Sequence, residues 1–174
     1  MSLDKEIEIR IAESEEDIQN IAVLADEIWH EYFPFILSKE QINYMVEKFQ
    51  SQNAMKHQIE QEGYIYYKVL ADHELIGYFA VREDKGDKAL FLSKLYLRQT
   101  CRGNGYGTRV FQYLKDFCFN HKLDKIWLTV NKYNENTINA YLKKGFVITD
   151  TRVLDIGNGY IMDDYIMEWV LALE

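Results

Sequence analysis

The stretch that most constrains the fold is residues 91–111, FLSKLYLRQTCRGNGYGTRVF. A strand-like run, residues 91–97, leads into a basic, glycine-rich turn that opens directly into a helical pattern. Gly103, Gly105 and Gly107 alternate, so the backbone there can take angles closed to other residues and can approach a ligand closely. The free N–H groups and positive dipole end of the following helix would face this turn. We therefore expect a site for an anionic group such as phosphate.

The rest of the chain predicts a regular alternation of elements. Apolar residues with helical spacing start after Ser14, and Pro34 should end that helix. Ser38 should cap a second helix, and Asn53 a short third one. The second helix should cover 39–50. Further helices are expected over 106–121 and 134–144, and strands over 7–12, 64–71, 74–84, 91–97, 126–130, 146–156 and 160–171. The apolar run at 126–130 suits a buried central strand. The order β-α-α-β-β-β-α-β-α-β-β predicts one α/β (α+β) domain, residues 1–174, with a mixed, mostly antiparallel sheet of about seven strands flanked by helices.

The composition of the chain restricts the kinds of partner and the cellular compartment that we expect. The chain has 174 residues, 48% hydrophobic and 28% charged, which is typical of one folded domain. A net charge of −8 argues against nucleic acid or an anionic membrane as partner and weakly favours a cationic substrate. Cys101 and Cys118 lack metal-ligand spacing, so we expect free thiols in a reducing, cytoplasmic compartment. No signal peptide is evident, and no apolar run approaches the roughly 18 residues of a membrane span.

Three kinds of phosphate-binding loop can be compared with the glycine-rich turn. The Walker loop needs a Lys after its last glycine, but Thr108 follows Gly107. The dinucleotide fingerprint needs a glycine where Thr108 stands and an acidic residue after the next strand, which ends at Val130-Asn131 without one. The third pattern, Arg/Gln-x-x-Gly-x-Gly/Ala, is matched throughout by residues 102–107, RGNGYG.

This third pattern resembles the pyrophosphate-binding motif of the GNAT acyltransferase superfamily, which binds acetyl-coenzyme A (acetyl-CoA). Residues 134–146, NENTINAYLKKGF, are similar to a second family signature, N-x-x-A-x-x-x-Y-x-x-x-G-F, with Thr137 in place of the usual Ala. The resemblance covers about residues 6–171 and is most specific over 91–146. It implies a GNAT-like fold and an acetyl-CoA-dependent N-acetyltransferase, similar to small bacterial acetyltransferases of amines and polyamines.

The resemblance also implies roles for individual residues. The strand before the loop would hold the pantetheine arm through its backbone, and an N–H there would polarise the thioester carbonyl, worth typically a few kcal/mol. Tyr141 would be catalytic by stabilising the departing thiolate, since a phenol with a pKa of about 10 is a reluctant acid; the alternative is a core position. Asn134 would contact the coenzyme, cap its helix, or do both. The expected coenzyme-binding residues are Leu95, Tyr96, Leu97, Arg102, Gly103, Asn104, Gly105, Tyr106, Gly107, Thr108, Asn134 and Lys144.

The general base is left open. An alkylammonium group with a pKa of about 10.4 is only about one part in a thousand neutral near pH 7.4, a deficit of roughly 4 kcal/mol, so something must accept its proton. In many relatives a Glu on the strand entering the loop does so, but residues 91–97 contain no carboxylate. The remaining options are a water chain or a side chain that otherwise fits a solvated surface role, namely Glu27, His30, Glu31, Asp163 or Asp164.

Acceptor selection is assigned to residues 30–44 and to the last hairpin. The residues expected to bind the acceptor are Glu31, Tyr32, Phe33, Tyr44 and Asp164. The expected partner is a small-molecule amine, a polyamine, or a protein N-terminus or lysine, with no nucleic acid, membrane or metal; the resemblance is compatible with a homodimer. A non-catalytic CoA-binding sensor or scaffold is the alternative, and the missing strand carboxylate keeps it open.

Overall fold

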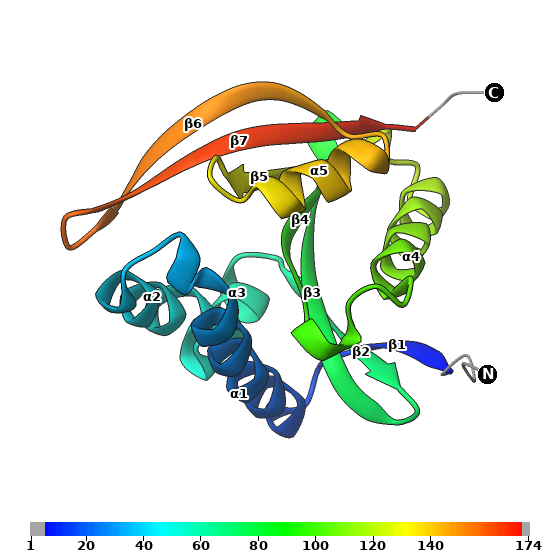
Figure 1. Cartoon of the computed structure of the whole chain (residues 1–174). Coiled ribbons are helices and arrows are strands. Elements are labelled where there is room, and N and C mark those ends of the chain that lie inside the picture. The colour runs from blue at the N-terminus through cyan, green and yellow to red at the C-terminus, as the bar shows by residue number, and fades with distance from the viewer. Residues whose placement is uncertain (1–5, 172–174) are drawn as a thin grey trace. The chain divides into compact units, whose positions relative to one another are not determined.

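The structure is a computed structural model that describes residues 6–171 (Figure 1). These residues form two compact units, which we call the amino-terminal unit (residues up to 82, with 94–114) and the carboxy-terminal unit (83–93, with residues from 115 onward). The prediction of a single domain remains a prediction. The helices are α1 (Glu15–Tyr32), α2 (Lys39–Met45), α3 (Gln52–Gln61), α4 (Tyr106–Asn120) and α5 (Glu135–Lys143). The strands are β1 (Ile7–Ile11), β2 (Ile65–Ala71), β3 (Glu74–Asp84), β4 (Ala89–Leu97), β5 (Lys125–Asn131), β6 (Val147–Gly157) and β7 (Tyr160–Val170).

Seven hydrogen-bonded strands follow the order β1-β2-β3-β4-β5-β7-β6. The pairs β1–β2, β2–β3, β5–β7 and β6–β7 are antiparallel, whereas β4 and β5 run parallel and pair Leu90 with Ile126. The predicted mixed, mostly antiparallel sheet with flanking helices is therefore confirmed. Every predicted strand is present, and the third helix is a full element of ten residues.

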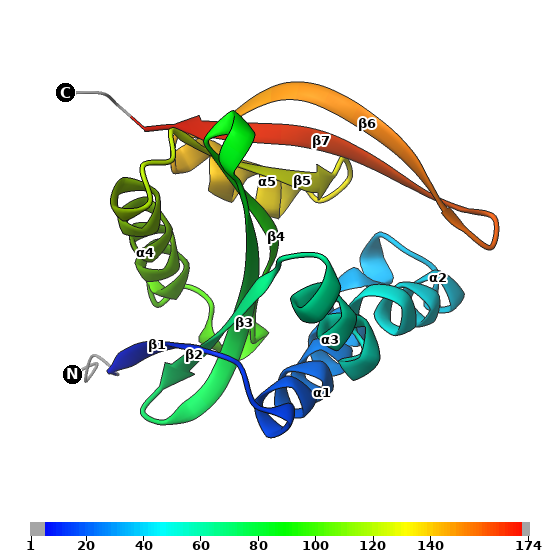
Figure 2. The same ribbon diagram turned by 180° about the vertical axis from the view of Figure 1, so that it is seen from behind.

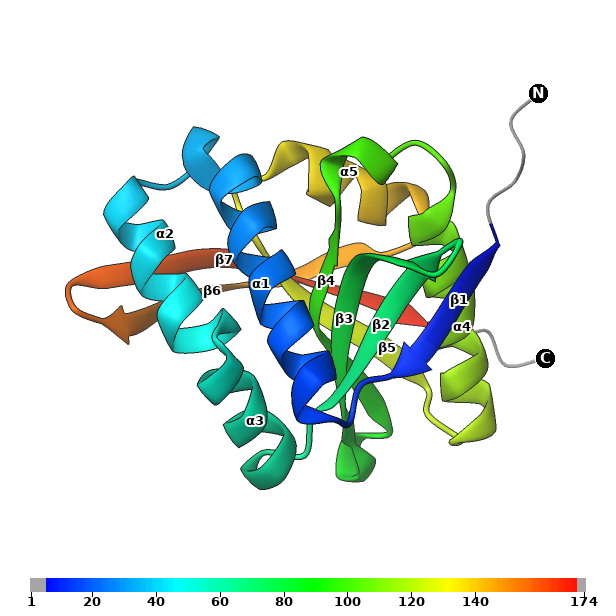
Figure 3. The same ribbon diagram turned by 90° about the horizontal axis from the view of Figure 1, so that it is seen from below.

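Helix α1 shows how local signals set an element of the amino-terminal unit. The Ser14 side chain accepts a hydrogen bond from the Asp17 N–H at 3.0 Å, and Pro34 lies in the short 3-10 turn Phe33–Phe35 that follows the helix. The apolar face of α1 packs on β2 and β3 (Figure 3). The core there consists of Ala12, Ile18, Ile21, Leu24, Ala25, Ile28, Met55, Tyr66, Tyr78 and Ala80.

The segment after α2 corrects two predictions. Residues 39–50 do not form one α-helix, because the turn Val46–Gln50 is π-helical. Helix α3 is capped by Ser51, whose side chain accepts from the Ala54 N–H at 3.2 Å, and not by Asn53. Ser51, the residue directly after the π turn, has the extended conformation (φ −77°, ψ 160°) that an N-cap needs.

Two hairpin turns are formed as their residues predict. Asp72 and His73 both have positive φ (48° and 69°), the geometry of a two-residue turn matched to the twist of β2 and β3. At the other turn, Gly157, Asn158 and Gly159 have φ values of 92°, 54° and 80°. Strands β6 and β7 that this turn joins form a long curved hairpin in the carboxy-terminal unit (Figures 1 and 2).

Strand β5 lies between β4 and β7, as expected of a central strand, but only one of its faces is fully buried. Burial alternates along it, with Ile126, Leu128 and Val130 buried and Trp127 and Thr129 only partly so. Trp127 instead stacks on Phe91 of β4, with ring centroids 4.1 Å apart, and donates through its indole N–H to Asp84. The apolar run of β5 thus combines one buried face with a second face on which Trp127 stacks on Phe91. No helix within residues 6–171 is long and apolar enough to cross a membrane.

Candidate functional site

The glycine-rich turn lies between β4 and α4 in the amino-terminal unit. Gly103 and Gly105 have positive φ (80° and 77°), a conformation that costs other residues about 1–2 kcal/mol. Gly107 does not, and it lies in the first turn of α4. At all three glycines an added Cβ would meet no atom within 4 Å, so one side of the turn is open. Two glycines are therefore needed for backbone angles, and all three leave room for a ligand.

Backbone donors collect at the same place. The first helical hydrogen bond of α4 runs from the Arg109 N–H to the Gly105 carbonyl at 3.1 Å, so the N–H groups of Tyr106, Gly107 and Thr108 have no partner within the helix. Asn104 braces the turn by donating from its amide to the Cys101 carbonyl at 3.2 Å. These N–H groups, together with the positive end of the helix, suit an anionic group such as a diphosphate.

Two arginines join this turn to α1. The Arg98 guanidinium lies 2.8 Å from a carboxylate oxygen of Glu27 and also donates to the Leu75 carbonyl. The Arg102 guanidinium carbon lies 4.5 Å from the ring centroid of Tyr32. Arg102 thus reaches back from the turn to the helix that carries the predicted acceptor residues.

The strand before the turn carries an aromatic side chain into a cluster. Tyr96 packs near Trp29 (5.7 Å between ring centroids), Tyr78 (5.5 Å) and Phe33 (6.4 Å), while Leu95 and Leu97 are half-buried. A Cβ at Gly77 would lie 2.5 Å from the Tyr96 carbonyl oxygen, so β3 can approach this backbone only with a glycine. Gly77, which the sequence did not single out, sets the path of the predicted pantetheine-binding strand.

The predicted acceptor residues of the amino-terminal unit have different environments. Glu31 is exposed, and Tyr32 and Tyr44 are half-buried. Phe33 is 7% exposed, and its ring lies 4.2 Å from that of Trp29. Phe33 therefore packs in the core, and Glu31, Tyr32 and Tyr44 are the ones accessible to an acceptor.

Helix α5 of the carboxy-terminal unit carries the second motif. Asn134 occupies its N-cap position and is 6% exposed, yet its side chain makes no capping hydrogen bond to the helix. The plain side-chain cap is thus not its role. At the other end Gly145, with φ at 100°, ends the helix next to Lys144, which is half-buried.

Tyr141 lies on α5, half-buried, with its ring 5.1 Å from that of Phe146. Burial raises the pKa of its phenol well above the usual value. The neutral phenol is therefore the stable form, which favours hydrogen-bond donation and disfavours transfer of the proton. Both of the expected alternatives, a packed ring and a donating hydroxyl, are compatible with this placement.

The five residues considered as a general base differ in their partners and in their exposure to solvent. Glu27 is paired with Arg98, and both ring nitrogens of His30 are hydrogen-bonded, to the Asp26 carbonyl (2.8 Å) and to Asn43 (2.6 Å). Asp163 is paired with Lys132 at 2.7 Å. Asp164 is 3% exposed, and Glu31 is exposed to solvent.

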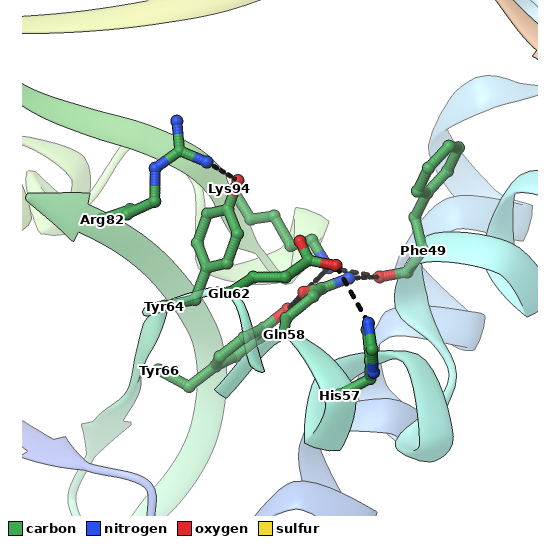
Figure 4. A network of polar contacts seen from close by, with 8 residues as sticks. All are labelled: Phe49, His57, Gln58, Glu62, Tyr64, Tyr66, Arg82 and Lys94. Carbon is green, nitrogen blue, oxygen red and sulfur yellow. Dashed lines mark hydrogen bonds and ion pairs between the residues drawn. The ribbon is translucent and has the colours of Figure 1, made fainter. Parts of the chain in front are cut away.

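A buried lysine on β4 is the main feature that the sequence reading missed. Lys94 is 6% exposed, and its ammonium donates to the Tyr66 hydroxyl (2.6 Å), to the Gln58 side chain (3.1 Å) and to the Phe49 carbonyl in the π-helical turn (Figure 4). Burial lowers its pKa to about 7, which the Glu62 carboxylate partly opposes. The sequence did carry a signal for this burial. Leu92, Lys94 and Tyr96 are at alternate positions of the strand and therefore lie on the same face.

The cysteines are free thiols, as expected. Burial, with a contribution from Glu83, raises the pKa of Cys118 to about 12, so it stays protonated. Within residues 6–171 no group of three or more His, Cys, Asp or Glu side chains is placed to hold a metal ion.

Comparison with known proteins identifies the family of this chain. The Acetyltransferase (GNAT) family matches residues 22–146. An uncharacterized N-acetyltransferase encoded in the pepI 3' region of Lactobacillus delbrueckii subsp. lactis is 24% identical over 151 residues, 83% of this chain and 87% of that protein. An uncharacterized N-acetyltransferase of Mycobacterium tuberculosis is 31% identical over 97 residues, 55% of this chain and 60% of that protein.

Solved structures share the fold. The PaiA N-acetyltransferase of Thermoplasma acidophilum, crystallised with coenzyme A, superposes with a TM-score of 0.78 at 22% identity, over 95% of this chain and 99% of that chain. The dodecameric spermidine N-acetyltransferase of Vibrio cholerae gives a TM-score of 0.65 at 20% identity, over 94% and 93% of the two chains.

The family match spans well over half of the chain. It confirms the resemblance read from residues 102–107 and 134–146, and with it the expectation of a GNAT-fold acyltransferase that uses acetyl-CoA. The protein is a member of the Acetyltransferase (GNAT) family.

Proposed function

We propose that the protein is an N-acetyltransferase that moves the acetyl group of acetyl-CoA to a primary amine by direct attack in a ternary complex. The observation that carries this proposal is the open, glycine-lined start of α4, where an added Cβ at Gly103, Gly105 or Gly107 meets no atom within 4 Å and the first helical hydrogen bond begins only at the Arg109 N–H. Residues 102–108 would hold the diphosphate, and the backbone of Leu95, Tyr96 and Leu97 the pantetheine arm. Asn134 and Lys144 would contact the same coenzyme.

In the proposed reaction the amine nitrogen bonds to the thioester carbon, and the carbon–sulfur bond breaks. The sulfur leaves with its electron pair, and the hydroxyl of Tyr141 donates a hydrogen bond to it. The ammonium group loses one proton to a base before the attack, directly or through water. The nitrogen loses a second proton as the amide forms, and this proton passes to the departing sulfur to give the thiol of CoA. Cys101 lies beside the proposed diphosphate loop, in the turn Gln99–Cys101, so we assign no acyl-enzyme to it.

The acceptor is proposed only as a class. The net charge of −8 suits a cationic small amine or polyamine, and the solved structures of the same fold include a spermidine N-acetyltransferase. A protein N-terminus or lysine is an acceptor of the same chemistry. Glu31, Tyr32 and Tyr44 are the accessible residues that we assign to acceptor recognition, and a homodimer remains a prediction.

The test is release of CoA from acetyl-CoA with a panel of amines that includes spermidine and a lysine-containing peptide. Turnover with at least one amine, lowered in Tyr141→Phe, supports the proposal. No turnover with any amine, combined with CoA binding by calorimetry, would instead establish the alternative, a non-catalytic CoA-binding sensor or scaffold. That alternative is favoured by one observation, the lack of a carboxylate anywhere in β4.

A further inference from the structure

The π-helical turn Val46–Gln50 is held in place by a buried lysine of β4. The Phe49 carbonyl in this turn accepts a hydrogen bond from the Lys94 ammonium group and, at 3.2 Å, another from the side-chain amide of Gln58 (Figure 4). The last carbonyls of a helical segment have no partner within it, and a carbonyl that is shielded from water without a donor costs free energy. The two donors therefore stabilise a turn of a rare kind.

The ammonium group of Lys94 has an acceptor for each of its three N–H bonds. Besides the Phe49 carbonyl, these acceptors are the Tyr66 hydroxyl at 2.6 Å and the Gln58 side-chain oxygen at 3.1 Å. None of the three is charged, and Lys94 is 6% exposed. Burying a charge without an oppositely charged partner costs free energy, and a Met of similar volume would avoid that cost. Stability alone therefore does not explain a lysine here, whereas a need to fix the Phe49 carbonyl does.

A second buried contact fixes the next residue of the same turn. The Tyr78 hydroxyl of β3 donates to the Gln50 side chain at 2.7 Å, and Gln50 is 3% exposed. The Tyr78 ring in turn lies 5.5 Å from that of Tyr96, between centroids. Lys94 directly precedes the segment 95–97 that we assign to the pantetheine arm, and Tyr96 lies within it. Both contacts thus join the π-helical turn to the part of β4 that would carry the thioester.

The turn also contacts a residue that we assign to acceptor recognition. Lys48, in the turn, donates from its ammonium group to the Tyr44 hydroxyl of α2 at 3.3 Å. The same ammonium group lies 5.5 Å from the ring centroid of Tyr44 and 5.6 Å from that of Phe49. A continuous set of contacts therefore runs from Lys94 through the turn to Tyr44. All of these residues belong to the amino-terminal unit.

We propose that Lys94 is a positioning residue for the acceptor amine. Its ammonium group fixes the π-helical turn, and the turn sets the position of Tyr44 relative to the thioester on β4. This inference rests on the proposed acetyl transfer and adds a determinant of amine binding that lies outside the coenzyme site. Lys94 acts through the turn and takes no part in the bonds that form and break.

The test is a double-mutant cycle on the kinetics with Lys94→Met and Tyr44→Leu. Lys94→Met should raise the KM for the amine about 5-fold or more and leave kcat and the KM for acetyl-CoA within about 2-fold, because only the acceptor contact moves. In a Tyr44→Leu background the same substitution should change the KM for the amine by less than about 2-fold, since the contact that it positions is absent. Effects of the two substitutions that simply multiply overturn the proposal.

Two milder variants decide the matter where Lys94→Met does not fold. Tyr78→Phe removes only the hydroxyl that holds the turn, and Lys48→Met removes an exposed side chain. Each should raise the KM for the amine at least about 2-fold. An unchanged KM for the amine in both variants overturns the proposal.

Lys68→Met is the matched control, because Lys68 is a half-buried lysine of the neighbouring strand β2 that does not contact the turn. It should leave both KM values unchanged, and a rise in the KM for the amine equal to that in Lys94→Met overturns the proposal in favour of a general loss of packing. Failure of the wild type to acetylate any amine overturns the proposed function together with this inference. Turnover with an unchanged KM for the amine in Lys94→Met overturns the role of Lys94 alone.

Discussion

The Arg102 guanidinium carbon lies 4.5 Å from the ring centroid of Tyr32, so the first residue of the glycine-rich motif rests on the last residue of α1. Such a contact is worth about 0.5–1 kcal/mol at an exposed site. The Arg98–Glu27 pair joins the same two segments at 2.8 Å. The turn proposed to hold the diphosphate is thus braced by the helix proposed to meet the acceptor.

We expect Tyr32→Leu to raise the KM for acetyl-CoA about 2- to 5-fold, because Arg102 loses the aromatic face that orients it. Tyr32→Phe keeps the ring and should leave this KM unchanged. Steady-state kinetics at saturating amine provides the measurement. Equal effects of both substitutions would point to the Tyr32 hydroxyl and contradict a stacking role.

Gly105→Ala should weaken coenzyme binding more than it weakens the fold. The positive φ of 77° makes Ala cost about 1–2 kcal/mol of unfolding free energy, and its Cβ would enter the open space beside the turn. Gly63→Ala is a matched control, because Gly63 has a φ of 79° and equally open surroundings but lies after α3.

Both glycine variants should lose similar stability in urea unfolding, and only Gly105→Ala should raise the Kd for CoA in calorimetry, by about 10-fold or more. If the two variants bind CoA equally well, the turn is not the diphosphate site.

Tyr141→Phe should lower kcat by about 10²-fold with little change in either KM, as expected for a donor used only when the thiolate develops. Because burial raises the pKa of Tyr141, its phenol stays protonated through the neutral range, and the loss should be the same at every pH between about 6 and 9. A loss confined to one end of that range would show that Tyr141 titrates during the reaction. Circular dichroism would check that packing against Phe146 is kept.

Lys94→Met should remove part of the pH dependence of stability. The folded pKa of about 7 lies below the ordinary value of 10.5, so the unfolded chain binds the proton more tightly and stability rises with pH between these values. The slope is at most about 1.4 kcal/mol per pH unit. Thermal melts at about pH 7 and about pH 9.5 should show a smaller rise in Lys94→Met than in the wild type.

Lys68→Met, on the neighbouring strand β2, is the control for that measurement. Lys68 is a half-buried lysine paired with Asp17 at 2.6 Å, and its loss should leave the rise of stability above pH 7 as large as in the wild type. An equal rise in Lys94→Met would mean that Lys94 stays charged in the folded protein.

Local signals predicted most of the elements. Ser14 and Ser38 both cap the helices expected of them, and Pro34 and Gly145 lie where helices end. These signals work because a cap or a turn depends on residues within about four positions along the chain. The π-helical turn Val46–Gln50 was not predictable in this way. The Phe49 carbonyl in this turn accepts hydrogen bonds from the Gln58 side-chain amide and from the ammonium group of Lys94, 45 residues away.

The sequence alone determined the family, the glycine-rich turn and the helix that follows it, since the motif residues are adjacent in the chain and their backbone needs are local. Only the tertiary structure decided the state of the ionisable groups. Asp163 and Asp164 are neighbours with the same side chain, yet one pairs with Lys132 and the other is buried with a raised pKa. By residue type alone, nothing distinguishes Lys94 from other lysines in strands. In the structure, its ammonium group is hydrogen-bonded to Tyr66 of β2 and to Gln58 of α3. The desolvation and pairing of an ionisable side chain depend on which segments, distant in the sequence, pack against it. Local sequence signals do not specify those contacts.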